Sequence, residues 1–303
     1  MDCFASLAMT DVMTPRTATL IGLTAILMWS LLAALTVATG KIPAFQLAAM
    51  TFAIGAAVGF LTWIGRRGAA RALRQSPLAW MVGVGGLFGY HALYVLALRF
   101  APPAEAGLLN YLWPLLIVLF SSLLPGERLA SHHLIGALLG LAGTVLLFAG
   151  NRSGGFAPGQ LPGLIAAFVA AFVWAAYSVM SRKLKAVPTD AVAGFCLATA
   201  LLAALVHGMV EATVWPHTAA QWLAIAALGI GPVGAAFYAW DIGMKRGDIR
   251  VLGAASYATP LLSTAFLMLA GFARPSIAIA IAAVLIAGGG FIAAKDMLWK
   301  KSL

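Results

Sequence analysis

Apolar runs, each about as long as a membrane-spanning helix, follow one another along almost the whole chain. A helix needs about 20 mainly apolar residues to cross the hydrocarbon core of a bilayer. Runs of this kind cover residues 18–39, 43–65, 77–100, 103–123, 132–150, 160–182, 189–210, 218–242, 249–272 and 276–296. They do not alternate apolar and polar residues as the strands of a membrane barrel do. The sequence therefore predicts an all-α membrane protein with ten transmembrane helices.

The composition excludes a soluble protein. Of the 303 residues, 62% are hydrophobic and only 9% are charged, whereas a soluble domain carries about 25% charged residues. The 2 cysteines, Cys3 and Cys196, cannot build a disulfide framework. A net charge of +10 would suggest nucleic acid as the partner of a soluble protein. Here the basic residues lie in short loops between apolar runs, so membrane topology explains them better and no nucleic-acid partner is expected.

The basic residues also predict an orientation. Lys and Arg number 19, and if the N-terminus is cytoplasmic all but four lie on the inner side; the exceptions are Lys41, Arg99, Arg152 and Arg274. Positive charge favours the cytoplasmic side, and an even number of spans places both termini there. Residues 1–17 and 297–303 are then cytoplasmic tails. We expect no signal peptide in the first residues, and Met1, Met9 and Met13 are candidate alternative starts.

The two halves of the chain are related by an internal repeat. Tyr111 and Pro114 align with Tyr257 and Pro260 at an offset of 146, and Trp29 aligns with Trp174 at an offset of 145. The units cover residues 18–150 and 160–296 and hold five spans each. An odd number of spans inverts the second unit relative to the first. Inverted repeats around a site near the bilayer midplane are common in transporters.

Several motifs of the first unit resemble one known family. These are Trp29-Ser30, the Tyr94-to-Arg99 end of the third run with Ala101-Pro102, Tyr111-Leu112-Trp113-Pro114, and Gly126-Glu127-Arg128. Together with ten spans in about 300 residues, they resemble the EamA-type members of the drug/metabolite transporter superfamily, and most closely the YddG-type aromatic amino acid exporters. The second unit departs from the pattern where Arg274-Pro275 replaces the acidic turn. The resemblance implies a multi-pass protein of the bacterial inner membrane that exports aromatic and other neutral amino acids.

Aromatic and polar residues inside the runs are the candidates for a central cavity. Tyr90 and Tyr94 lie one helical turn apart in the third run, with His91 beside them, and polar groups this deep in a membrane are costly. Pro114 and Pro260 break their helices at matching positions, which is typical of a transporter binding site. The expected substrate-binding residues are Trp29, Tyr90, His91, Tyr94, Asn110, Trp113, Trp174 and Tyr257. The alternative is that these residues pack helices together, with His91 paired to a neighbouring helix. Separately, His91 is a candidate proton carrier.

Other signals are expected to be structural. Gly229-x-Gly231-x-x-Gly234 matches a dinucleotide fingerprint, but no strand precedes it. Asp241 and Glu105 are expected near span ends within reach of water, Trp240 at the membrane interface, and His132-His133 at a helix start. The sequence shows no phosphate-cradling loop, no metal-ligand spacing and no paired acid and base, so we expect no cofactor, no metal and no enzymatic activity.

These observations favour an exporter of neutral, mainly aromatic or bulky apolar amino acids that works by alternating access or by facilitated diffusion. The absence of an acidic residue between Arg16 and Lys41 disfavours the export of small cationic drugs. Two alternatives stay open: export of another metabolite or drug on the same fold, and a membrane enzyme or lipid-handling protein. The sequence also leaves the energy coupling and the oligomeric state open, and a monomer is compatible with it.

Overall fold

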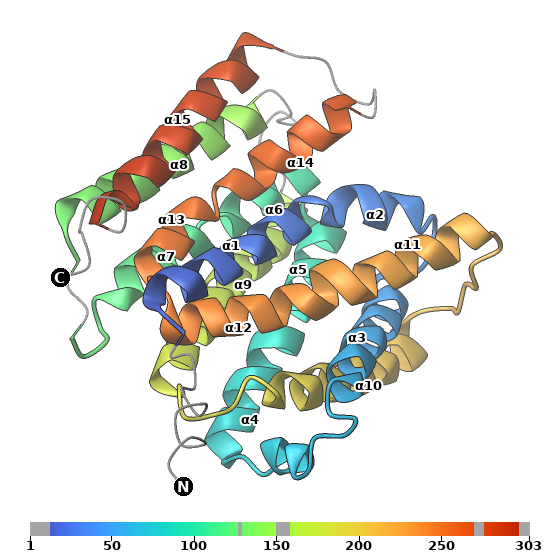
Figure 1. Cartoon of the computed structure of the whole chain (residues 1–303). Helices are drawn as coiled ribbons and strands as arrows, with labels where there is room; N and C mark the ends of the chain where they lie inside the picture. Colours follow the sequence, from blue (N-terminus) through green and yellow to red (C-terminus); the bar gives the residue numbers. More distant parts are fainter. Residues whose placement is uncertain (1–12, 127–128, 150–157, 270–275, 297–303) are drawn as a thin grey trace, which may run out of the picture.

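The computed structural model describes residues 13–126, 129–149, 158–269 and 276–296, and every regular element in these ranges is helical (Figure 1). The first half forms, in order, α1 (Pro15–Ser30), α2 (Leu32–Ala38), α3 (Ala44–Leu61), η2 (Ala69–Leu73), α4 (Pro77–Val84), η3 (Gly85–Gly89), α5 (Tyr90–Phe100), α6 (Pro103–Asn110), α7 (Trp113–Ser121) and α8 (Ser131–Ala149). The second half forms η4 (Pro158–Gln160), α9 (Leu161–Lys183), α10 (Ala191–Val210), α11 (Ala219–Ile230), η5 (Gly231–Ala235), α12 (Ala236–Arg246), α13 (Ile249–Ala255), α14 (Ala258–Leu269) and α15 (Ile277–Ala293).

The helices are long and apolar enough to make this a multi-pass membrane protein. Within the described residues, seven helices can cross a membrane by length and composition: Pro15–Ala38, Ala44–Leu61, Pro77–Phe100, Ser131–Phe148, Leu161–Lys183, Ala191–Val210 and Ala219–Arg246. Glu105–Ser121 and Ile277–Ala293 are shorter apolar helices. Large apolar side chains such as Leu201, Leu223 and Val284 are 63%, 70% and 72% exposed, as expected for surfaces that face lipid.

Helix starts follow signals in the sequence. The Thr14 hydroxyl accepts a hydrogen bond from the Thr17 N–H, and Pro15 then opens α1. Ser76 and Pro77 start α4 in the same way. Thr218 and Gln221 cap α11 reciprocally, in a capping box. Such caps pair amides that no helical carbonyl can reach, so these boundaries were encoded in a few neighbouring residues.

Two of the predicted runs are interrupted near their prolines. The run 103–123 divides into α6 and α7 at Tyr111 and Leu112, and the run 249–272 divides into α13 and α14 at Ser256 and Tyr257. Proline has no N–H to donate to the preceding turn, so a break before it costs the helix less. The first run is also divided, at Leu31, where no proline stands.

A wide π-helical turn recurs in both halves. The first, η3, spans Gly85–Gly89, and the second, η5, spans Gly231–Ala235, so both begin and end 146 residues apart. A π-turn holds one residue more than an α-helical turn and therefore rotates everything that follows it. The helices that follow, α5 and α12, present their first residues to the centre of the molecule.

Close helix pairs organise the packing. In Figure 1, α8 and α15 lie side by side at one end of the molecule, while α3, α10 and α11 pack together at the other. Helix α1 lies against α12, and α5 against α9. Glycines allow the close approach of α8 to α15, because a Cβ atom added to Gly136 would lie 2.5 Å from the carbonyl oxygen of Gly289. This agrees with the small-residue interfaces expected between membrane helices.

Some sequence features lie outside the described residues. They are the first dozen residues, Glu127 and Arg128 of the Gly-Glu-Arg turn, residues 150–157 with Arg152, the Arg274-Pro275 turn and the last residues from 297 onward.

Candidate central cavity

A cavity of about 200 Å³ lies where helices of both halves meet. Its wall comes from α1, α2, α5, α6, α7, α9, α12 and α14. The lining residues are Trp29, Leu32, Ala33, Tyr90, His91, Tyr94, Asn110, Tyr111, Trp113, Trp174, Phe237, Thr259 and Ser263. The structure thus brings together all of the expected substrate-binding residues except Tyr257.

Polar groups on one side of the cavity have unused hydrogen-bonding capacity. The Asn110 amide Nδ2 donates to the Tyr90 hydroxyl over 3.0 Å. Within the described part of the chain, neither the Asn110 Oδ1 atom nor the Thr259 hydroxyl has a hydrogen-bond partner, although both atoms are buried. An unpaired buried polar atom costs about 1–3 kcal/mol, so a ligand that pairs with it recovers that cost.

His91 adds an acceptor. Its Nδ1 lies 2.7 Å from the carbonyl oxygen of Leu87 in the π-turn η3. Since a carbonyl oxygen only accepts, Nδ1 carries the proton, and Nε2 of the neutral ring keeps its lone pair. The π-turn therefore orients the His91 ring. Its neighbours are aromatic: Phe52 at 4.9 Å and Tyr90 at 5.2 Å between ring centroids.

Four tryptophans pack together beside the cavity, and Trp29, Trp113 and Trp174 line it. Trp29 lies 5.5 Å from Trp174 and 5.0 Å from Trp240 between ring centroids, and Trp113 lies 6.2 Å from Trp174. Trp113 and Trp174 are only 5% and 3% exposed. The expectation that Trp240 lies at the membrane interface is wrong, because this side chain is fully buried and its Nε1 donates to the Ser178 hydroxyl. Its indole packs more favourably in the cluster, where its N–H also has a partner.

The side chains that line the described cavity carry no permanent charge, since Asp, Glu, Lys and Arg are absent from its wall.

Two buried charged side chains outside the cavity, Asp241 and Lys245, pair with each other. Asp241 is 3% exposed, so the expected access to water is wrong. It lies 2.8 Å from the Lys245 ammonium and accepts from the Thr189 hydroxyl over 2.7 Å. Lys245 also donates to the Val187 carbonyl. Because these charges are paired and hydrogen-bonded, they tie α12 to the α9–α10 connection.

Tyr257 lies outside the cavity. Its side chain is fully buried against Gly140, and its hydroxyl accepts a hydrogen bond from the Leu115 N–H over 3.2 Å. Leu115 follows Pro114 in the first turn of α7, where backbone amides have no helical partner. Tyr257, at the break between α13 and α14, therefore caps α7, the helix that follows the break after α6. Its counterpart Tyr111 lines the cavity instead.

The repeat offset could have found two residues that motif reasoning missed. Phe237 stands 146 positions after His91, and Thr259 stands 146 positions after Trp113, and all of these side chains line the cavity. Leu32, Ala33 and Ser263 carry no comparable sequence signal. Trp29 also reaches across the repeat, since its Nε1 donates to the Pro232 carbonyl of η5 over 3.0 Å.

A second cavity of about 310 Å³ adjoins the first. It lies between α2, α3, α5, α10 and α11, and it shares Leu32, Tyr90, His91 and Tyr94 with the first cavity. Most of its other lining residues are apolar, among them Phe45, Phe52 and Leu228. The face formed by Tyr90, His91 and Tyr94 thus borders both spaces.

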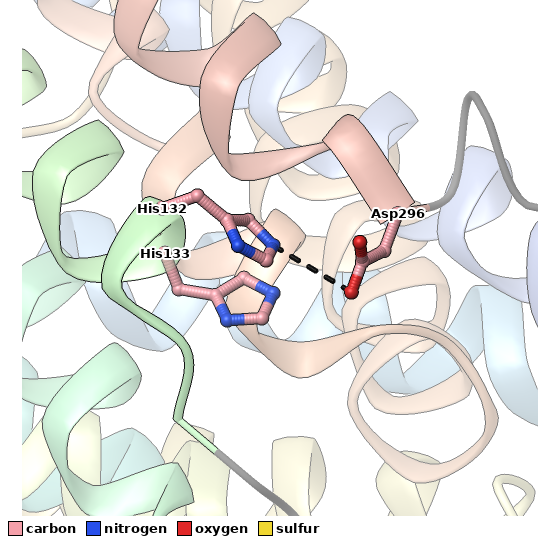
Figure 2. Close-up of side chains that lie close together, drawn as sticks. All are labelled: His132, His133 and Asp296. Carbon is pink, nitrogen blue, oxygen red and sulfur yellow. Dashed lines mark ion pairs between the residues drawn. The ribbon is translucent and has the colours of Figure 1, made fainter.

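One group of metal-ligand side chains was not expected from the sequence. His132 and His133 at the start of α8 meet Asp296, with candidate ligand atoms within 4.8 Å of one another (Figure 2). His132 Nε2 lies 3.6 Å from the Asp296 carboxylate. However, His133 Nδ1 accepts the Ala130 N–H, so the neutral ring carries its proton on Nε2 and cannot bind a metal through that atom. The geometry fits a cap at the predicted helix start better than a metal site.

The sequence comparisons with known proteins all identify transporters as the relatives of this chain. The profile of the EamA-like transporter family matches residues 16–149 and again residues 161–294. The aromatic amino acid exporter YddG of Ancylobacter novellus is 58% identical over 93% of this chain and 98% of its own length. The exporters of the same name from Salmonella typhimurium and Escherichia coli are 29% and 27% identical over 84% and 92% of the chain. A crystal structure of a protein that is 57% identical superimposes with a TM-score of 0.89, over 95% of this chain and 100% of the other.

Proposed function

The chain belongs to the EamA-like transporter family, and we propose that it exports neutral amino acids with aromatic or bulky apolar side chains through the central cavity. Membership of a transporter family and relatives named as exporters make it a transporter rather than an enzyme. The observation that carries the substrate class is the wall of the cavity, which combines aromatic rings with unpaired but uncharged polar atoms.

Such a wall suits a zwitterion. The ammonium group of the substrate donates to Asn110 Oδ1 and to His91 Nε2, and the carboxylate accepts from the Thr259 hydroxyl. Hydrogen bonds to charged groups contribute about 1.5–3 kcal/mol. A substrate with a net charge would place that charge in a wall without a counter-ion, which is costly inside a membrane. The same argument disfavours cationic drugs as substrates.

For the architecture, we propose ten spans in two inverted five-helix repeats, residues 18–150 and 160–296, with cytoplasmic tails at 1–17 and 297–303. The double match of the family profile supports the duplication. So do the paired π-turns η3 and η5. The shorter helices α6 with α7, α13 with α14, and α15 would supply the remaining spans. The bias of Lys and Arg supports an inner-membrane protein with both termini cytoplasmic.

An efflux assay tests the proposed function. Purified protein is placed in liposomes loaded with Trp, Phe, Leu or Ala, and efflux is followed with and without a pH gradient. We expect protein-dependent efflux that is fastest for Trp and Phe and needs neither nucleotide nor metal. A change of rate with the gradient would indicate proton exchange, and an unchanged rate would indicate facilitated diffusion. The proposal is wrong if only a non-amino-acid metabolite or a cationic drug leaves the liposomes.

A further inference from the structure

The packed tryptophans leave little free surface for the ring of a substrate. Trp113 and Trp174 are almost fully buried, and their rings pack against one another and against Trp240. The Trp29 indole is held by the Pro232 carbonyl. In this arrangement most of the surface of each indole ring contacts another protein side chain. The unpaired polar atoms Asn110 Oδ1 and Thr259 Oγ1 belong to the first cavity, which therefore suits the polar head of an amino acid.

The larger free space lies on the other side of Tyr90, His91 and Tyr94. The second cavity measures about 310 Å³, against about 200 Å³ for the first. Its wall is mainly aliphatic and aromatic, and Asp, Glu, Lys and Arg are absent from the described residues that form it. The two cavities share four residues and therefore adjoin each other, so a substrate that occupies both must reach past these shared side chains.

Several polar side chains stand in this wall, and the hydroxyl of one of them is unpaired. Thr199 on α10 lines the second cavity, is 1% exposed, and its hydroxyl oxygen has no partner among the described residues. The hydroxyls of Thr39 and Thr51 in the same wall instead donate to backbone carbonyls of their own helices. An unpaired hydroxyl in a mainly apolar pocket suits the polar edge of an aromatic ring, such as an indole N–H or a phenol O–H.

On the basis of the proposed function, we propose that the second cavity is the pocket for the substrate's side chain. The ammonium and carboxylate groups stay in the first cavity, the aromatic ring enters the second between α3, α5 and α10, and Thr199 accepts the indole N–H or phenol O–H. Apolar rings fill this pocket, whereas the side chain of alanine leaves it empty. The size of this pocket therefore determines which side chains are preferred.

Filling the pocket tests its role. Ala203 lines the second cavity but not the first, and it is 1% exposed. Ala203→Leu should lower the efflux of Trp and Phe at least tenfold more than that of Ala. Ala204→Leu makes the same change at an exposed position of the same helix that lines neither cavity, and should change none of the three rates. All rates are normalised to folded protein, measured by size-exclusion chromatography after extraction.

Removing the hydroxyl gives a second, milder test that keeps the volume. Thr199→Val should slow Trp and Tyr efflux by about two- to tenfold, from the loss of one hydrogen bond, and leave Phe unchanged. Thr199→Ser should restore the rates for Trp and Tyr. Equal losses for Trp, Phe and Ala in Ala203→Leu, with no separation of Trp from Phe in Thr199→Val, would overturn the pocket while the proposed function stands. Displacement of co-purified phospholipid by Ala203→Leu without any change in efflux would also overturn it, because the cavity would then hold lipid. A wild-type protein that exports no aromatic amino acid would overturn both.

Discussion

At the scale of single residues, Asn110 carries the clearest prediction for the polar head. Replacing it by Leu keeps the branched shape but removes the acceptor Oδ1 and the amide that donates to Tyr90. Loss of a hydrogen bond to an ammonium group should raise KM roughly ten- to hundredfold. The effect should be the same for Trp, Phe and Ala, because all of them have the same head. Initial efflux rates at graded substrate concentrations would measure it.

Tyr90→Phe is the matched control for Asn110→Leu. It removes only the hydroxyl that accepts from Asn110 Nδ2 and leaves Oδ1 in place. Its effect on KM should be severalfold smaller. A substitution of Asn110 that harms Trp efflux and spares Ala efflux would contradict a role in binding the head.

Trp113→Ala should act mainly on stability. The ring is 5% exposed and packs edge-on against Trp29, Trp174 and Trp240. Removing a large buried aromatic side chain costs about 3–5 kcal/mol. Thermal unfolding in detergent should therefore begin at a clearly lower temperature, and the remaining folded protein should lose Trp, Phe and Ala transport to a similar extent. A selective loss of Trp and Phe with unchanged unfolding would instead indicate direct stacking on the substrate.

At the scale of helices, the contact between α8 and α15 depends on glycine. A Cβ atom at Gly136 would lie 2.5 Å from the Gly289 carbonyl oxygen and 2.8 Å from the Ala293 Cβ. Gly136→Ala should force the helices apart and cost about 1–3 kcal/mol in unfolding free energy. Gly288→Ala and Gly290→Ala meet open space on α15 and should be neutral or stabilising, because alanine favours helix. Denaturant unfolding of the three variants would compare them, and equal destabilisation would exclude close packing as the cause.

The cap of α13 predicts a dependence of stability on pH. Asp248 accepts the N–H groups of Arg250 and Val251 and pairs with the Arg250 side chain at 3.1 Å. Burial alone raises the pKa of the Asp248 carboxyl, but the hydrogen bonds and charge of Arg250 outweigh burial, so its pKa lies below the ordinary value. A lowered pKa means that the cap stabilises the fold above the unfolded-state pKa of about 3.9. This contribution is lost as the pH falls through the lower, folded-state pKa.

Thermal unfolding between pH 6 and pH 3 would measure this effect. Wild type should be more stable than Asp248→Ala at pH 6, and the difference should shrink as the pH approaches 3. Asp248→Asn keeps a neutral cap and should lie between them at pH 6. A difference that stays constant over this range would show that the charge of Asp248 does not contribute.

At the scale of the whole molecule, the proposed inverted topology predicts which loops face the cytoplasm. Lys183 lies at the end of α9 and Lys41 precedes α3, and they should lie on opposite sides of the membrane. In a variant without native cysteines, Lys41→Cys should react with a membrane-impermeant maleimide in intact cells. Lys183→Cys should react only after permeabilisation. Reaction of both positions in intact cells would contradict the proposed orientation and with it the inverted repeat.

Much of the fold could be predicted from neighbouring residues. Apolar runs of about 20 residues predict membrane helices, prolines such as Pro114 predict breaks, and Thr or Ser before proline predicts helix starts. The offset of 146 recurs in the structure as the spacing of the two π-turns. Most of the expected cavity residues also line one cavity. The reason is that polar groups deep in a membrane helix are costly unless they face the protein interior or a cavity.

The neighbours of each side chain depended on helices far away in the sequence. Tyr111 and Tyr257 occupy equivalent positions, yet one lines the cavity and the other caps α7, because the helices packed against them differ. No neighbouring residue in the sequence signals that Trp240 and Asp241 are buried. Trp240 contacts Trp29 and Ser178. Asp241 pairs with Lys245 and Thr189. The second cavity is space between α3, α5, α10 and α11. Length, apolarity and capping belong to consecutive residues, whereas a cavity or a buried partner exists only once separate helices have packed together.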